Sequence, residues 1–278
     1  MIRGSVLYEV LESRGIRSVV DPSMGVPVHL GYLKRHGIAV HGGDVFDWAV
    51  RVGEGIAVND SVILRDEDIA SIVEMLPGRV YSLDHFTPWE GTLFSQEQCR
   101  YLDVWRDNVR ALRSDAHVGL AILGLWRVFC YWMQKAQTPD AMEDVAPGDL
   151  AWQYLRQTPP LATNGLHNTV RCADPATVVD ACRAEALVLD ASAEKNRDDT
   201  RIWMWEAWWR GNPHFRPDPP SHEHELARLV ARADSYRDVL VATTQRAARD
   251  AADALRPSRR SIESVSTGSG DVYIVASR

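Results

Sequence analysis

The chain has 278 residues, of which 45% are hydrophobic and 25% are charged, so it is long enough to bury a full core. Its formal net charge is −7, and its sequence pI is near 5.7. Because neutralisation of phosphates by Lys and Arg supplies most non-specific affinity for nucleic acids, this balance argues against a general polyanion-binding surface. We expect one compact unit with room for an insertion.

Cysteines occur at four scattered positions: Cys99, Cys130, Cys172 and Cys182. No two form a short Cys-x-x-Cys pair, which argues against structural zinc and against a disulfide scaffold. The N-terminus lacks the apolar core of a signal peptide. The longest apolar run, 118–133, is interrupted by Arg127 and is shorter than the roughly 20 residues of a membrane span. We therefore expect a cytoplasmic protein with no membrane segment and no metal site.

Apolar spacing in the first sixty residues predicts alternating helices and strands. In chain order we expect a helix at 6–12, a strand at 17–20, a helix at 28–35, a strand at 38–41 and a helix at 45–52. Gly37 is suited to end the second helix as a C-terminal cap. This alternation predicts a parallel sheet with crossover helices.

The first strand leads into Asp21-Pro22-Ser23-Met24-Gly25, an acid followed by a glycine turn. Gly25 has no Cβ, so the backbone can turn sharply there and approach a ligand closely. Asp44 ends the second strand about twenty residues later, where its carboxylate can accept hydrogen bonds from ribose hydroxyls. The pattern predicts a nucleoside cofactor at the carboxyl edge of the sheet.

The glycine turn also restricts the kind of cofactor. Pro27 stands where a second glycine of the phosphate-binding pattern would fall, which disfavours a dinucleotide. A glycine turn with no phosphate to hold fits S-adenosylmethionine better. The alternative is a tight strand-to-helix turn in some other α/β domain.

Strand-like alternation disappears after Asn59 for roughly a hundred residues. The helices expected in this region lie at 66–75, 95–112 and 116–136. Ser95 and Gln98 form a capping box at the start of the second of these. The third is apolar nearly all round and is expected to be buried. We interpret the region as a helical insertion.

The α/β pattern returns near the middle of the chain. Further strands are expected at 169–172, 186–189 and 239–243, and a hairpin is expected from 261–266 and 271–276 around Thr267-Gly268-Ser269-Gly270. The chain then divides into 1–59 and 166–278, the two halves of a cofactor-binding α/β core, with the insertion at 60–165. A mostly parallel sheet with a C-terminal antiparallel hairpin resembles the class I methyltransferase plan.

Four arginines fall at near-helical spacing in and directly after the second predicted helix of the insertion: Arg100, Arg106, Arg110 and Arg113. They are compatible with a local basic face for a nucleic acid. The alternative, which the spacing favours, is a solvated helix face on which they pair with Asp103 and Asp107.

These features together resemble the adenine-specific DNA methyltransferases of the Dam-like type, in which a helical segment separates the cofactor and catalytic motifs. Residues 21–25 look like the family's Asp-Pro-Phe-x-Gly, and Asp44-Val45-Phe46 looks like its second-strand acid. Residues 91–106 are similar to a Phe-Ser/Thr-x-Glu-x-x-x-x-Leu-Asp-x-x-Arg segment of one branch. Residues 168–174 look like the strand whose terminal acid meets the adenine of the cofactor.

The resemblance implies a class I methyltransferase-like fold that binds S-adenosylmethionine. The residues that it implies for cofactor binding are Asp21, Pro22, Ser23, Gly25, Asp44 and Asp174. The sequence departs from the family after the next strand, where Asp190-Ala191-Ser192-Ala193 replaces Asp/Asn-Pro-Pro-Tyr/Phe. In the family that motif grips the amine of an extruded adenine and stacks on the base, which contributes roughly 1–3 kcal/mol.

Asp190 keeps the position of the motif's acid, at the carboxyl end of a central strand. It is suited to orient an amine or accept a proton, with Glu194 or Asn196 assisting. The alternative is a solvated strand-to-helix loop. Because the aromatic ring and the prolines are missing, we expect an altered acceptor site, and whether its acceptor is a small molecule or DNA is left open.

A tryptophan-rich stretch follows: Trp203, Trp205, Trp208 and Trp209. The last three have helical spacing, which favours core packing, and the alternative is an aromatic wall beside the active site. Trp203 is the member that we expect to face a ligand. His222 and His224 suit a helix start better than a metal site, because no third ligand accompanies them.

Three functions follow from this reading of the sequence. The first is an S-adenosylmethionine-dependent transferase with an altered acceptor site. The second is an enzyme that acts on S-adenosylmethionine itself, by intramolecular cyclisation or by release of methylthioadenosine. The third is a catalytically inactive homologue that binds DNA or a partner protein through the helical insertion. No feature of the sequence predicts an oligomeric state.

Overall fold

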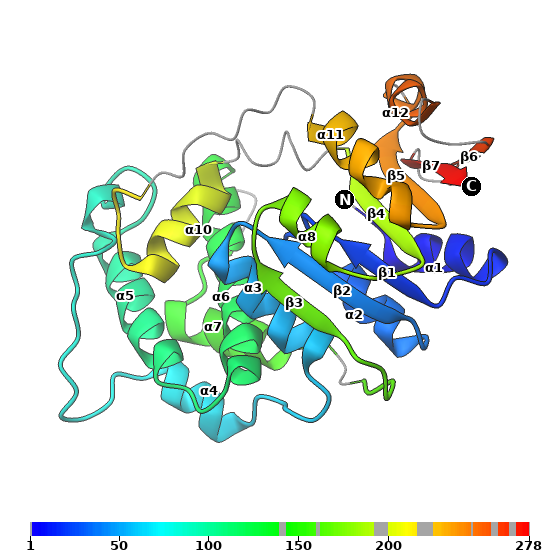
Figure 1. Ribbon diagram of the computed structural model, residues 1–278. Helices are drawn as coiled ribbons and strands as arrows, with labels where there is room; N and C mark the ends of the chain where they lie inside the picture. Colours follow the sequence, from blue (N-terminus) through cyan, green and yellow to red (C-terminus); the bar gives the residue numbers. More distant parts are fainter. Residues whose placement is uncertain are drawn as a thin grey trace.

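The computed structural model describes residues 2–138, 143–159, 162–191, 200–215, 225–245, 247–256, 261–266 and 271–277. Seven strands form one sheet in the order β3-β2-β1-β4-β5-β7-β6 (Figure 1). Their bounds are β1 (Ser18–Asp21), β2 (Ala39–Asp44), β3 (Thr169–Cys172), β4 (Ala186–Asp190), β5 (Asp238–Thr244), β6 (Ser261–Ser266) and β7 (Asp271–Ser277). Strands β1 to β5 pair in parallel, whereas β7 is antiparallel to β5 and to β6. The predicted mostly parallel α/β sheet is confirmed, and it is compatible with a Rossmann-like fold.

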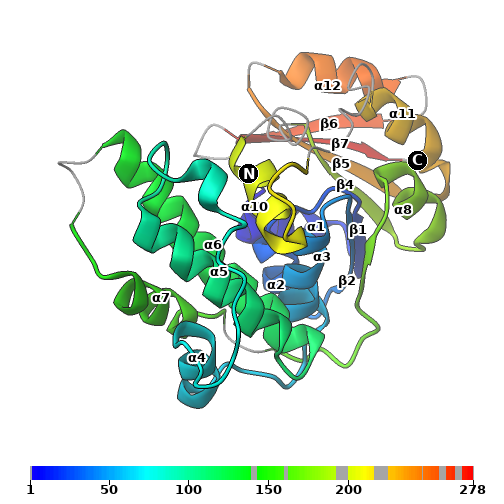
Figure 2. The ribbon, with the colours of Figure 1, turned by 90° about the vertical axis from the view of Figure 1, so that its left-hand side faces the viewer.

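Helices cover both faces of the sheet (Figure 2). Helices α1 (Gly4–Ser13) and α2 (Val28–Arg35) pack on one face, where they meet Val19 of β1. On the other face, Val20 meets the apolar layer of the helices α8 (Pro175–Ala181), α11 (Glu225–Arg232) and α12 (Ala248–Leu255). Because successive side chains of a strand point to opposite faces, strands covered on both sides are apolar throughout.

The chain between β2 and β3 is helical and gathers on one side of the molecule (Figure 1). Its elements are α3 (Asp47–Gly53), the π-helical turn η1 (Glu54–Val58), α4 (Asp66–Val73), α5 (Gln96–Arg110), α6 (Asp115–Gln137) and α7 (Pro147–Arg156). They share one apolar core with α10 (Thr200–Arg210), which follows β4. This segment is therefore packed onto the rest of the protein through α3 and α10.

Helix α6 is long and apolar enough to cross a membrane by length and composition, and it is the one such helix in the described part of the chain. In its most apolar window, 67% of the residues are buried inside the protein. The expectation that this run forms a buried helix is thus confirmed, with bounds one residue wider at each end than the predicted 116–136.

Helix α6 and the segment formed by α3 and η1 cross at two glycines. A Cβ on Gly119 would lie 1.9 Å from the carbonyl oxygen of Arg51, and one on Gly55 would lie 2.7 Å from the backbone nitrogen of Leu120. Both contacts are with backbone atoms, which cannot swing away as side chains do. The close crossing of these two elements therefore requires glycine.

The predicted helix at 45–52 begins two residues later, at Asp47, and continues into η1, so its length was underestimated. Helix α7 was missed, although Pro147 occupies its first turn, a position where proline is common. Helix α8 was missed as well, although Asp174 caps it and Pro175 follows directly. These helices have at most ten residues, too few for apolar periodicity to stand out.

The solvated-face interpretation is wrong for one arginine of the row, Arg106, and for one of its expected partners, Asp103. Asp103 is 0% exposed and Arg106 is 5% exposed, and only the pairing of Arg106 with Asp107, at 2.9 Å, matches the expectation. Arg106 is covered by the residue that follows α10, because a Cβ on Gly211 would lie 2.0 Å from Nη1 of Arg106, whereas Asp103 lies against His85. Helix α10 is distant from α5 in the sequence, so the spacing of the arginines along α5 could not indicate that α10 packs against them.

The tryptophan stretch is mainly core, as its spacing predicted. Trp205, Trp208 and Trp209 are buried, and the rings of Trp205 and Trp208 stack with centroids 3.9 Å apart. Trp203 is half-buried and meets Phe46 edge-on, with the ring centroids 6.5 Å apart. Trp203 therefore stands close to the end of β2, where Asp44 lies.

Candidate functional site

The glycine turn after β1 is closed onto the acid that ends β2. The backbone N–H of Gly25 donates to Oδ2 of Asp44 at 2.9 Å, and the N–H of Phe46 donates to Oδ1 at 3.0 Å. Asp44 is only 6% exposed. The structure thus brings together two residues that the sequence singled out, 19 positions apart, and gives the carboxylate a role in fixing the turn.

Asp21 stabilises the same turn from its other end. Its Oδ1 accepts the N–H of Ser23 at 2.9 Å, and its Oδ2 lies 2.7 Å from Nε2 of His29. Both Asp21 and His29 are buried, and Pro22 between them in sequence order is buried as well. Sequence reasoning missed His29, because an imidazole in the first turn of a crossover helix has no distinctive pattern.

Glycines allow the turn and its neighbours to approach one another. Gly25 has a φ of +53°, a backbone conformation that favours glycine, and a Cβ there would meet nothing within 4 Å. In β2, a Cβ on Gly42 would lie 2.5 Å from Sδ of Met24, and one on Gly43 would lie 2.3 Å from the side chain of Val178. The turn therefore packs tightly on β2, while its outer side at Gly25 borders open space.

Asp174 caps α8 and stays at the surface. Its carboxylate accepts the N–H groups of Ala176 and Thr177, each at 3.1 Å, and lies 3.6 Å from a guanidinium nitrogen of Arg228. The hydrogen bond from the Thr177 hydroxyl is the main reason that the pKa of Asp174 is lowered. The side chain is 52% exposed, and none of these bonds joins it to Asp21 or Asp44.

Asp190 is half-buried at the carboxyl end of β4. Strand β4 lies between β1 and β5, and Val20 of β1 pairs with Leu187 of β4. The strand order reverses between β1 and β4, which is where open α/β sheets bind ligands. Asp190 therefore stands on a strand next to this reversal of the strand order.

The other two predicted catalytic residues, Glu194 and Asn196, lie outside the described residues, as do His222 and His224. Within the described ranges, no group of three or more His, Cys, Asp or Glu side chains is placed to hold a metal ion.

Glu206 of α10 is a buried acid that sequence reasoning missed. Its two carboxylate oxygens accept the N–H groups of Asp47 and Trp48, each at 3.2 Å, in the first turn of α3. Arg210, one turn further along α10, donates to it as well. Burial raises the pKa of Glu206, and the hydrogen bonds to its ionised form oppose this shift. Glu206 thus fixes α10 against the helix that follows Asp44.

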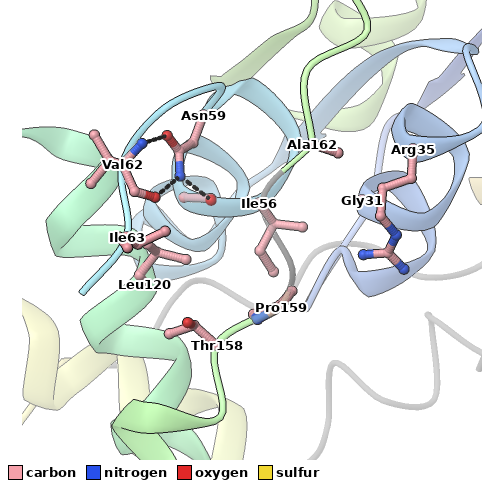
Figure 3. A pocket seen from close by; sticks show the side chains of 11 residues that line it. Gly31, Arg35, Ile56, Asn59, Val62, Ile63, Leu120, Thr158, Pro159 and Ala162 are labelled. Carbon is pink, nitrogen blue, oxygen red and sulfur yellow. Dashed lines mark hydrogen bonds between the residues drawn. The ribbon is translucent and has the colours of Figure 1, made fainter. Parts of the chain in front are cut away.

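A small cavity and a larger pocket differ in the size of the ligand that they can bind. A cavity of about 10 Å³ lies under η1, where the amide of Asn59 bonds to Gly55 and Val62 (Figure 3). It is large enough for about one water molecule and therefore too small for a cofactor. A pocket of about 510 Å³ lies at the carboxyl end of β3, beside Asp47 and Cys172. Its size is that of a small-molecule site.

Asp103 has an unusual setting on α5. It is fully buried, no hydrogen bond of good geometry reaches its carboxylate from the described residues, and the backbone groups of Phe86 and His85 only partly offset its burial. Nδ1 of His85 lies 3.6 Å from Oδ1, and burial lowers the pKa of His85, which favours the neutral imidazole. Because burial disfavours the charged form, the pKa of Asp103 is raised to about 7.

Replacing Asp103 by asparagine is expected to weaken the pH dependence of stability. The folded state keeps a proton that the unfolded state, with a pKa of about 3.9, has released, so Asp103 lowers stability as the pH rises from about 4 to 7. The loss is on the order of a few kcal/mol at pH 8. Urea unfolding at pH 5 and pH 8 should therefore show a smaller decline for Asp103→Asn than for the wild type.

Glu97→Gln, a change at an exposed acid on the same helix, is the control and should leave the decline unchanged. An equal decline in wild type and Asp103→Asn would show that Asp103 is ionised in the folded protein.

No protein-family model matches the chain, and a search of curated proteins finds no significant relative. Its function is therefore assigned from the geometry of the site.

Proposed function

We propose that the protein binds S-adenosylmethionine at the carboxyl edge of β1 and β2 and is a transferase with an altered acceptor site. The main support is the bond between the Gly25 N–H and the Asp44 carboxylate, which places a glycine turn and a second-strand acid together. They lie beside the point where the strand order reverses. The parallel strands and antiparallel C-terminal pair agree with the class I methyltransferase plan that the motifs resemble.

Three features of this edge fit the cofactor. Asp44 ends β2 at the carboxyl edge of the sheet, directly beside the glycine turn, which is where the proposal places the ribose hydroxyls. The open space outside Gly25 lets a ligand lie against the turn. Trp203, half-buried against Phe46, offers an aromatic edge near the same acid.

S-adenosylmethionine would supply an electrophilic methyl group on its sulfonium. The task of the protein is then to align a lone pair of the acceptor with that group, since positioning provides most of the rate. Asp190, on a strand next to the reversal of the strand order, is suited to orient an amine or to take up its proton. Without the Pro-Pro-Tyr/Phe part of the family motif, a small molecule is the acceptor that we favour over an extruded base.

Replacing Asp44 by asparagine is expected to weaken binding of S-adenosylmethionine by about 10- to 100-fold, because hydrogen bonds to a charged group contribute about 1.5–3 kcal/mol. The amide retains one oxygen for the Phe46 N–H but presents an NH₂ group in place of the other oxygen. Isothermal titration calorimetry measures the change, and Glu97→Gln is the matched control at an exposed acid.

Asp44 also fixes the turn, so thermal melting must show that the variant is folded at the titration temperature. Folded Asp44→Asn that binds S-adenosylmethionine as tightly as the wild type would remove Asp44 from the cofactor site.

A further inference from the structure

The pocket of about 510 Å³ lies where the end of α10 meets α5, the start of α3 and the end of β3. Figures 1 and 2 show α10 lying beside both α3 and α5. Two arginines, Arg110 of α5 and Arg210 of α10, line this pocket together with Asn212. Both arginine side chains are exposed.

Each arginine is held in place by part of its guanidinium. Nη2 of Arg110 donates to the carbonyl oxygen of Trp209 at 2.5 Å, and the guanidinium lies 5.1 Å from the centre of the Trp209 ring. Nε of Arg210 donates to Glu206, and its guanidinium lies 4.6 Å from the centre of the Phe215 ring. Because these contacts fix the side chains, less conformational entropy is lost when a ligand binds.

The remaining nitrogens of both guanidinium groups are unengaged within the described part of the chain. These are Nε and Nη1 of Arg110 and both Nη atoms of Arg210. Asn212 adds a further donor, because its Oδ1 accepts the N–H of His214 at 3.1 Å and its amide nitrogen is left for a ligand.

The acceptors around the pocket are already engaged. Oδ2 of Asp47 accepts the indole N–H of Trp209 at 2.6 Å, and its Oδ1 lies 3.6 Å from Nε of Arg51. Glu206 accepts two backbone N–H groups as well as Arg210. The available polar atoms of the pocket are therefore mainly donors, which is the complement of an anion.

We propose that this pocket binds a phosphate group, through Arg110 and Arg210, and that this group belongs to the small acceptor of the transferase. A planar guanidinium group can donate two parallel hydrogen bonds to the oxygens of a phosphate. Two such groups carry two positive charges, which match a phosphate dianion better than a carboxylate with its single negative charge. The charges agree, since two arginines, Arg110 and Arg210, and one carboxylate, Asp47, line the pocket.

The assignment to the acceptor rests on the proposed function, whereas the anion site rests on its own geometry. The pocket lies on the β3 side of Asp44, because Cys172 at its wall pairs with Asp44 across the two strands. A phosphate held there would fix one end of an acceptor whose other end reaches toward the cofactor edge.

Calorimetric titration with inorganic phosphate, at constant ionic strength and with acetate as the monoanion control, tests the site directly. We expect phosphate to bind in the millimolar range or tighter and acetate not to bind. Arg110→Gln and Arg210→Gln should each weaken phosphate binding by about tenfold, the loss of one charge-assisted contact. Arg113→Gln, a change at an exposed arginine outside the pocket, should leave it unchanged.

Thermal melting of each variant separates loss of the site from loss of the fold. Arg110→Lys keeps the positive charge but loses the planar guanidinium, so it should also bind phosphate more weakly. No phosphate binding by the wild type, or equal binding by the folded Arg110→Gln and Arg210→Gln variants, overturns the anion site.

Two further titrations test the assignment to the acceptor. A 5′-mononucleotide and a single-stranded oligonucleotide distinguish the sources of the phosphate, and tighter binding of the oligonucleotide overturns a small acceptor. S-adenosylhomocysteine and phosphate should bind to the protein at the same time. Competition between them would contradict the inference that the phosphate pocket and the cofactor site are separate. Phosphate binding without any binding of S-adenosylmethionine would keep the anion site and contradict the proposed function alone.

Discussion

Replacing Glu206 by alanine is expected to destabilise the protein by about 1–3 kcal/mol for each buried donor that is left without an acceptor. The N–H groups of Asp47 and Trp48 would lose their acceptor in a buried setting, and Arg210 would lose its carboxylate. Urea unfolding monitored by circular dichroism measures the change. Unfolding of the variant without denaturant would agree with this expectation.

Glu206→Gln keeps the shape and one acceptor oxygen, so its loss should be smaller than that of Glu206→Ala. Glu97→Ala, at an exposed acid, should change stability by less than about 0.5 kcal/mol. If Glu206→Ala were as stable as Glu97→Ala, α10 would not depend on this contact with α3.

Replacing Gly119 by valine is expected to cost about 3 kcal/mol or more, which is the upper end of the range for overpacked sites. The new Cβ would lie 1.9 Å from the Arg51 carbonyl oxygen, so α3 and α6 would have to separate. Since α3 begins three residues after Asp44, the separation should also weaken ligand binding at the turn. Thermal melting and calorimetry measure the two effects.

Gly148→Ala is the matched control, because a Cβ there meets only the side chain of Val73 at 3.6 Å, an ordinary contact. It lies in the first turn of α7. A Gly119→Val protein that melts at the temperature of Gly148→Ala would contradict the close crossing of α3 and α6.

The elements that the sequence predicted well are those with a local signal. Strands β4 and β5 are covered on both faces, so their unbroken apolar runs identify them without knowledge of their neighbours. The glycine turn was also predicted, because the residues of the turn are consecutive and Asp44 is the last residue of an identifiable strand. In each case the determining residues are close in sequence or follow one strand.

The contacts that the sequence did not predict join distant parts of the chain. Glu206 and Asp47 are 159 positions apart, and the guanidinium of Arg106 is packed against Gly211, which directly follows α10. Such pairs depend on how α5 and α10 pack, and helical spacing on either helix describes only that helix. His29 is closer to Asp21, yet nothing in its own surroundings marks it as the partner of an acid.

Titration of the purified protein with S-adenosylmethionine is the most direct test of the cofactor site, followed by incubation with and without unmethylated duplex DNA. We expect binding that Asp44→Asn weakens, and no S-adenosylhomocysteine that depends on DNA. Methylthioadenosine formed without an acceptor would instead identify an enzyme acting on the cofactor itself, and binding to DNA without turnover would identify an inactive homologue. Absence of S-adenosylmethionine binding by the folded wild-type protein would contradict the account at its centre, the turn closed by Gly25 and Asp44.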